Sequence, residues 1–183
     1  MPWLIGILVV VVLIALFIIS NYNGLVKLRN KVKDQWAQID VSIKMRADLI
    51  PNLVETVKGY ASHEKETLDA VINARAEALS AKTPEAEMKA NGELSNALGR
   101  LLALSEAYPD LKANTNFLDL QKQLQELEEK ISYARQFYND AVLTYKNKLE
   151  VFPSNIIGSM FGFKPEAFFE ATGADREVPQ VKF

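Results

Sequence analysis

The sequence predicts an all-α protein in which an N-terminal transmembrane helix precedes an elongated antiparallel four-helix bundle and a short irregular C-terminal tail. Residues 3–19 (WLIGILVVVVLIALFII) carry no charge. Between Leu25 and Phe152, apolar residues recur at spacings of three and four, Gly and Pro are sparse, and no segment alternates as a strand would. We therefore divide the chain into an anchor (1–20), a bundle domain (21–150) and a Phe-rich tail (151–183).

The anchor is long enough to cross a lipid bilayer as a helix. At about 1.5 Å per residue, residues 3–19 span roughly 26 Å, close to the hydrocarbon thickness. Only Met1 and Pro2 precede the run, so it lacks the basic start of a cleaved signal peptide. Four cations follow it before the first acid: Lys27, Arg29, Lys31 and Lys33. This asymmetry predicts an outside N-terminus and a cytoplasmic bundle.

Capping residues and apolar stripes place the bundle helices at about 22–47, 49–79, 84–107 and 116–150. Thr83 and Pro84 form a favourable helix start, and Asn116 is expected to cap the last helix after a loop over 108–115. Pro51 allows two interpretations, a new helix capped by Asp48 or a single kinked helix. Because one helix over 21–79 would extend about 88 Å, far beyond the next helix, we prefer four helices.

The last bundle helix carries the clearest periodicity. Its apolar positions alternate at spacings of three and four, which predicts a heptad seam for packing inside a bundle or between copies of the chain. The seam consists of Phe117, Leu120, Leu124, Leu127, Ile131, Ala134, Tyr138, Ala141 and Tyr145.

The tail holds six of the nine phenylalanines, and its Pro and Gly residues allow only short turns of helix. Residues 178–183 are predicted to be extended. Such a tail can pack on its own bundle, dock on a neighbouring subunit or enter the membrane interface. The candidate contact residues are Phe152, Phe161, Phe163, Phe168 and Phe169.

Composition argues against most chemistry. The 21 basic and 23 acidic residues are interspersed, which is untypical of a nucleic-acid surface, and there is no cysteine. His63 is the single histidine and lies in no metal-binding or nucleophile motif, so we expect it at a solvated surface. We predict no catalytic residue, no metal and no cofactor.

Polar residues beside the apolar stripes are the remaining candidates. Arg46, Asn52 and Glu55 border the second stripe, while Arg135 and Asn139 flank Tyr138 in the last helix. A buried Arg–Glu pair between helices would fix their register, whereas the alternative is that these polar ends reach solvent.

Several blocks of this sequence resemble the LemA family of bacterial proteins. The blocks are residues 22–30 (YNGLVKLRN), 36–41 (WAQIDV), 46–60 (RADLIPNLVETVKGY), 108–114 (YPDLKAN), 134–139 (ARQFYN) and 152–155 (FPSN). The resemblance implies a single-pass protein of the bacterial cytoplasmic membrane, with its N-terminus outside and an elongated helical bundle inside. It implies no catalytic residues.

Two classes of function remain open. The first, which we prefer, is a non-enzymatic structural or interaction protein that self-assembles or acts as a scaffold at the membrane. The second is an accessory or sensor subunit of another membrane protein, such as a protease or a transporter. Oligomers in detergent would favour the first class, and a stable complex with one partner would favour the second.

Overall fold

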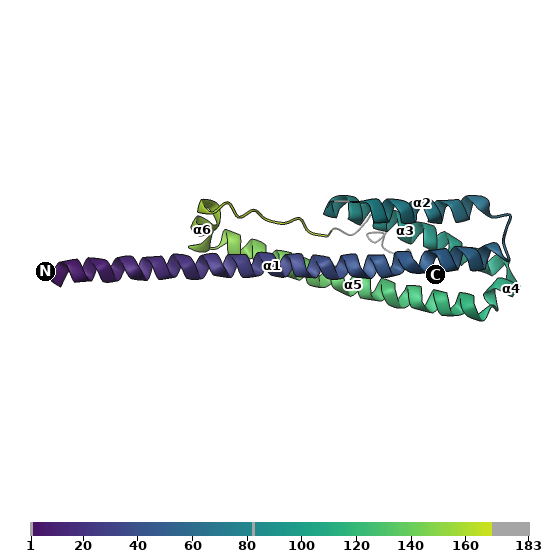
Figure 1. Ribbon diagram of the computed structural model, residues 1–183, viewed down its shortest axis with the longest axis horizontal. Helices are drawn as coiled ribbons and strands as arrows, with labels where there is room; N and C mark the ends of the chain where they lie inside the picture. Colours follow the sequence, from purple (N-terminus) through teal and green to yellow (C-terminus); the bar gives the residue numbers. More distant parts are fainter. Residues whose placement is uncertain (1, 82, 170–183) are drawn as a thin grey trace, which may run out of the picture. The chain divides into compact units, whose positions relative to one another are not determined.

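A computed structural model describes residues 2–81 and 83–169, and every regular element in these ranges is helical. The predicted extended segment 178–183 lies outside the described residues. The elements are α1 (Pro2–Lys58), α2 (Lys65–Ser80), α3 (Pro84–Leu104), the 3-10 helix η1 (Ser105–Ala107), α4 (Pro109–Lys112), α5 (Thr115–Glu150) and α6 (Ser154–Met160) (Figure 1).

The described chain divides into two compact units, and α1 and α5 each contribute to both. The first unit contains residues 2–38 and 134–169, and the second contains residues 39–133. The part of α1 before residue 20 is apolar and exposed, and α1 is the one helix in the described chain that is long and apolar enough to cross a membrane.

The predicted break at Asp48 is wrong, because α1 continues through Pro51 to Lys58. Proline has no backbone N–H, so the carbonyl of Ala47 loses its usual helical donor. Arg75 Nε of α2 donates a hydrogen bond to that oxygen at 2.7 Å. A side chain distant in sequence therefore replaces the missing donor, which explains why the helix continues through the proline.

The first helix ends instead at the turn over residues 59–64. The amide of Ala61 donates to the carbonyl of Val57 at 2.8 Å, and that of Glu64 donates to Ala61 at 3.1 Å. The predicted second helix, 49–79, is thus divided between the end of α1 and the whole of α2. The break lies about ten residues after the predicted one.

Two further helix starts test the capping predictions. Thr83 caps α3 as predicted, since its hydroxyl oxygen accepts a hydrogen bond from Ala86 N at 3.2 Å. The predicted cap of the last helix is wrong. Asn114, and not Asn116, accepts from the amide of Phe117 at 3.0 Å, and α5 begins at Thr115. The predicted loop before it contains α4, with Pro109 at its first position.

The second unit has a continuous apolar core. Figure 1 shows α2 and α3 side by side, and both contribute to this core together with segments of α1, α4 and α5. Burying a large aliphatic side chain contributes about 1.5–3 kcal/mol, so this core is the main source of stability of the unit. The fully buried large apolar members are Ile50, Leu53, Val57, Val71, Leu94, Leu101, Leu111 and Phe117.

The heptad seam of α5 is used inside the chain. Eight of its nine side chains are buried, and only Ala134 is half-buried. In the first unit, α5 contributes Tyr138, Ala141 and Tyr145 to the interior, while α1 contributes Leu25 and Val32. The side chains that the periodicity singles out are therefore already covered by residues of the same chain.

Candidate functional site

Residues 161–169 follow α6 without regular secondary structure (Figure 1); we call this segment the strap. Its side chains and backbone contact α1 and α5. At its start, the rings of Phe161 and Phe163 meet the ring of Tyr22 edge-on, with centroids 4.9 and 5.5 Å apart. The guanidinium carbon of Arg29 lies 5.1 Å from the centre of the Phe163 ring. These contacts join the strap to α1 just past the apolar run.

At its other end the strap is held by aromatic and cationic side chains. Phe169 lies with its ring centre 4.4 Å from the Arg135 guanidinium and 6.4 Å from the Trp36 ring. Tyr138 packs edge-on against Trp36 at 5.3 Å, and its hydroxyl donates a hydrogen bond to the carbonyl of Ala167 at 2.8 Å. A cation over an aromatic face contributes about 0.5–1 kcal/mol at exposed sites and more when desolvated.

Asn139 binds the backbone of Phe169 twice. The side-chain oxygen of Asn139 accepts from the amide of Phe169 at 2.7 Å, and its nitrogen donates to the carbonyl of Phe169 at 2.9 Å. An irregular segment has no neighbouring strand or helical turn to satisfy its backbone groups. The Asn139 side chain satisfies both backbone groups of Phe169 and so holds that residue against α5.

Tyr145 is fully buried in this unit, and burial raises the pKa of its hydroxyl. Arg29 opposes that rise in pKa, and Glu166 of the strap adds to it. The phenol is thus neutral at physiological pH. It fills space between the two helices and the strap and carries no charge.

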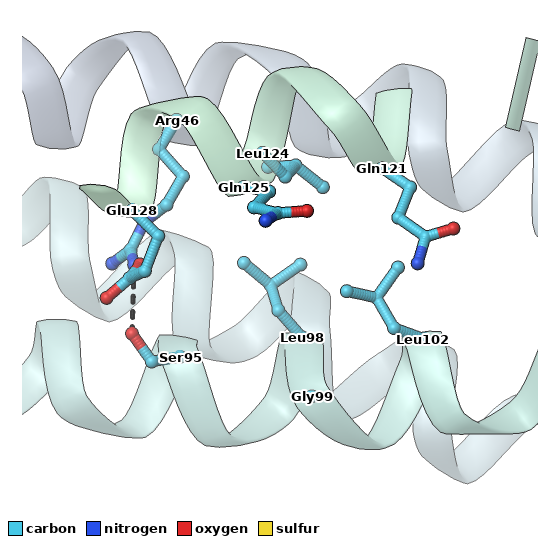
Figure 2. A pocket seen from close by; sticks show the side chains of 9 residues that line it. All are labelled: Arg46, Ser95, Leu98, Gly99, Leu102, Gln121, Leu124, Gln125 and Glu128. Atoms are coloured by element: carbon cyan, nitrogen blue, oxygen red, sulfur yellow. Dashed lines mark hydrogen bonds and ion pairs between the residues drawn. The ribbon is translucent and has the colours of Figure 1, made fainter. Parts of the chain in front are cut away.

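The second unit contains a buried cation, Arg46, which is 1% exposed. Its guanidinium donates to the carboxylate of Glu128 on α5, to the side-chain oxygen of Asn91 on α3, and to the hydroxyl of Ser95 at 2.9 Å. Figure 2 shows Arg46 reaching between Glu128 and Ser95. The guanidinium of Arg46 on α1 therefore links α3 and α5, and these bonds fix the register of the three helices.

A pocket of about 380 Å³ opens beside this cluster. Figure 2 shows Leu98 and Leu102 of α3 facing Leu124, Gln121 and Gln125 of α5, with the ion pair of Arg46 and Glu128 at one end. The walls are mainly apolar, and no histidine, cysteine, serine–histidine pair or carboxylate pair lines it among the described residues. The pocket could therefore hold a mainly apolar molecule and hydrogen-bond to it, but the described residues that line it contain no acid–base pair suited to catalysis.

Glu87 is a second polar feature of this unit. Partial burial, and secondarily the negative charge of Asp40 on α1, raise the pKa of the Glu87 carboxyl above its usual value. Two carboxylates on neighbouring helices repel each other when both are ionised. This pair opposes stability at neutral pH, in contrast to the Arg46 cluster.

The LemA family profile matches residues 35–183. The chain belongs to the LemA family.

Relatives of this LemA-family chain include magnetosome proteins. Magnetosome protein MamQ 2 of Paramagnetospirillum magneticum is 27% identical over 192 residues, which cover 91% of this chain and 70% of the relative. Magnetosome protein MamQ of Magnetospirillum gryphiswaldense is 24% identical, with 90% and 71% covered. Protein LemA of Metamycoplasma hominis is 24% identical, with 86% and 73% covered. The family and the exposed apolar start of α1 together indicate a membrane-associated protein.

The structure places one set of the predicted candidate residues of this LemA-family chain in the first unit, which includes the strap, and the other, Arg46, Asn52 and Glu55, in the second unit. The structure brings Arg135, Tyr138 and Asn139 together with the predicted phenylalanines, because Phe163 and Phe169 pack within the same unit. Phe168 is half-buried with its ring centre 5.7 Å from Lys146 Nζ. The strap contacts its own helices, whereas Phe152 is 78% exposed.

Arg46, Asn52 and Glu55, which border one apolar stripe in the sequence, do not come together in the structure. Arg46 is buried, but Asn52 and Glu55 are exposed, and Glu55 lies 3.7 Å from Lys58 in a solvent-exposed pair. Exposed pairs of this kind contribute little stability. Asn52 and Glu55 line a separate shallow pocket with Asn116 and Asp119.

The partners of Arg46 were not found from the sequence. Asn91 and Ser95 interrupt the apolar stripe of α3 at helical spacing, and Glu128 lies next to the seam residue Leu127. A polar residue inside an apolar stripe is the feature of the sequence that could have identified Asn91 and Ser95 as partners of a buried charge. His63 is exposed, as predicted, and no group of three or more metal-binding side chains occurs within residues 2–81 and 83–169.

Proposed function

We propose that this protein is a non-enzymatic scaffold anchored in the bacterial cytoplasmic membrane by residues 3–19, with its N-terminus outside and its helical body in the cytoplasm. The observation that carries the proposal is α1 itself. Its apolar start is uncovered by any other part of the described chain, and the helix continues past Leu25 without interruption. A membrane segment joined to the body by a helix, and not by a flexible linker, suits a protein that presents surfaces at a defined place.

The orientation follows from charge. Lys27, Lys31 and Lys33 are exposed on α1 immediately after the apolar run. Basic residues that flank a membrane span are retained on the cytoplasmic side. A reporter fused after Phe183 is therefore expected to be active in the cytoplasm, and periplasmic activity would contradict the proposed orientation.

We also propose that the body is an antiparallel four-helix bundle. Short connections at 59–64 and 81–83 reverse the chain between α1, α2 and α3, and residues 105–114 separate α3 from α5. Helices joined by short loops pack as antiparallel neighbours.

Self-assembly requires a surface other than the heptad seam, because that seam is buried within the chain. Val41 and Met45 supply such a surface. They are four residues apart on α1, so they share one face, and they are 49% and 53% exposed. Contiguous exposed apolar surface favours contacts between proteins, and these two side chains are adjacent on the helix.

The test is the mass of the full-length protein in mild detergent, measured by light scattering. We expect a uniform assembly that dissociates when Val41 and Met45 are both replaced by Glu. The matched control is Ile72→Glu, which places the same charge at an exposed apolar position of α2. A monomer that co-purifies in fixed ratio with one membrane protein would instead support an accessory subunit, and a monomer with no partner would contradict the scaffold.

A further inference from the structure

The segment between Glu150 and Lys164 has an unusual surface. These thirteen residues carry no charge, and five of their apolar side chains are 50% to 78% exposed. We call these five the α6 patch: Val151, Phe152, Ile156, Met160 and Phe161. A helix that faces water normally presents polar side chains on its outer face, so this patch calls for an apolar or amphipathic cover.

The inner face of α6 is already occupied by the body of the first unit. Ile157 and Gly158 are buried, and a β-carbon at Gly158 would lie 2.9 Å from Leu149 Cδ2 and 3.8 Å from Leu25 Cδ1. Ile156 and Met160 are four residues apart and share the opposite face. The helix thus carries apolar side chains on its buried face and also on its exposed face, where Ile156 and Met160 lie beside Asn155 and Ser159.

The α6 patch begins where the apolar run of α1 ends. Tyr22 lies three residues after Ile19, a rise of about 4.5 Å along the helix. Its ring centre is 4.9 Å from that of Phe161. Leu25, which packs beside Gly158, is one further turn along α1. The uncovered apolar surface therefore continues from the run onto α6.

We propose that the α6 patch is buried in the lipid–water interface of the same membrane that α1 crosses, which gives the chain a second, monotopic contact with the bilayer. This inference rests on the proposed membrane anchoring. Lipid is the occupant because the patch is continuous with the apolar run, and a partner protein would have to cover both. In this arrangement Tyr22 lies at the interfacial depth where tyrosine is enriched, and the apolar rings of Phe152 and Phe161 face the lipid.

Basic residues outnumber acidic ones around the patch, where the acids are Glu150, which lies 4.0 Å from Lys146, and Glu166. Lys27 and Arg29 follow the run on α1, Lys146 and Lys148 precede the patch on α5, and Lys164 follows it. Long basic side chains at this depth extend to the headgroups and are attracted to anionic lipid.

The test uses the full-length protein, whose natural sequence has no cysteine to give background labelling. Ile156→Cys and Met160→Cys are labelled separately with an environment-sensitive fluorophore and reconstituted in vesicles of phosphatidylethanolamine and phosphatidylglycerol. Both sites are exposed, so the substitutions remove no core packing. Leu13→Cys serves as the anchor control and Gln136→Cys, exposed on α5 of the same unit, as the water-facing control.

We expect lipids with a quencher near the headgroup to quench both α6 labels several-fold more than the Gln136 label, and deep quenchers to act most on the Leu13 label. Quenching at Leu13 together with α6 labels that behave like Gln136 would overturn the inference and leave the anchor intact. Absence of quenching at Leu13 would overturn both the inference and the anchoring. Disulfide-linked dimers of Phe152→Cys, with no lipid quenching at α6, would show that a second copy covers the patch.

Discussion

The two units use polar side chains in opposite ways. In the second unit, Arg46 is buried among three helices and donates hydrogen bonds to the side chains of Asn91, Ser95 and Glu128. In the first unit, Asn139 uses its side chain to bind backbone atoms of an irregular segment. The polar contacts of the second unit fix helices against one another, and those of the first unit fix a strap on helices.

This difference predicts different consequences when a contact is removed. A buried charge network is coupled to the packing of all its helices, so its loss affects a whole unit. A backbone segment held at its end can open locally while the helices beneath it remain folded. The following substitutions test that contrast, beginning with the largest effect.

Arg46→Met keeps an unbranched apolar stem but removes the guanidinium. We expect a loss of about 2–3 kcal/mol in the free energy of unfolding, because the buried Asn91 oxygen and the Glu128 carboxylate lose their donor. Chemical unfolding followed by circular dichroism measures it. Arg100→Met, at an exposed position of α3, is the matched control. Equal stability of the two variants would contradict the structural role of the cluster.

Asn139→Ala removes both hydrogen bonds to Phe169. We expect local opening of the strap to become easier by about 1–2 kcal/mol, since each bond contributes about 0.5–1.5 kcal/mol. Amide hydrogen exchange at residues 161–169 should accelerate about tenfold, while exchange in α3 stays unchanged. Asn147→Ala, at an exposed position of α5, should leave the strap unchanged. Faster exchange throughout the protein would show that the strap does not open independently of the helices beneath it.

Gly99→Ala should stabilise the second unit. A β-carbon at Gly99 would meet no heavy atom within 4 Å, and alanine is favoured over glycine inside a helix by about 1 kcal/mol. We expect a gain of about 0.5–1 kcal/mol in unfolding experiments, without any change in strap exchange. A loss of stability would mean that the pocket beside Gly99 is filled in solution.

Glu87→Gln gives the smallest expected effect and depends on pH. Because folding raises the pKa of Glu87, the group favours the folded state below its unfolded pKa near 4.5 and loses that contribution as pH rises through the folded value. At pH 7 the variant should therefore be more stable than the natural protein, by less than about 1 kcal/mol for a partly exposed group. The difference should shrink toward acidic pH. A variant that is less stable at pH 7 would contradict the repulsion from Asp40.

The all-helical class and the buried positions of the α5 seam could be predicted from the sequence. The spacing of Phe117, Leu120 and Leu124 identified buried positions, and Thr83 was correctly identified as a cap. The position of the first break could not be predicted, because the donor that satisfies Ala47 comes from Arg75, 28 residues further along the chain. The partners of Arg46 were missed for the same reason, since Asn91 and Glu128 lie on other helices.

The sequence by itself determined the all-helical class, the apolar run and the residues on each apolar stripe, because all three depend on local periodicity and composition. Only the tertiary structure decided where α1 ends, which acid pairs with Arg46 and where the strap (161–169) packs. Each of these depends on a contact between residues distant along the chain. The tail illustrates both cases, because its phenylalanines are visible in the sequence, while the burial of Phe169 and the exposure of Phe152 come from the fold.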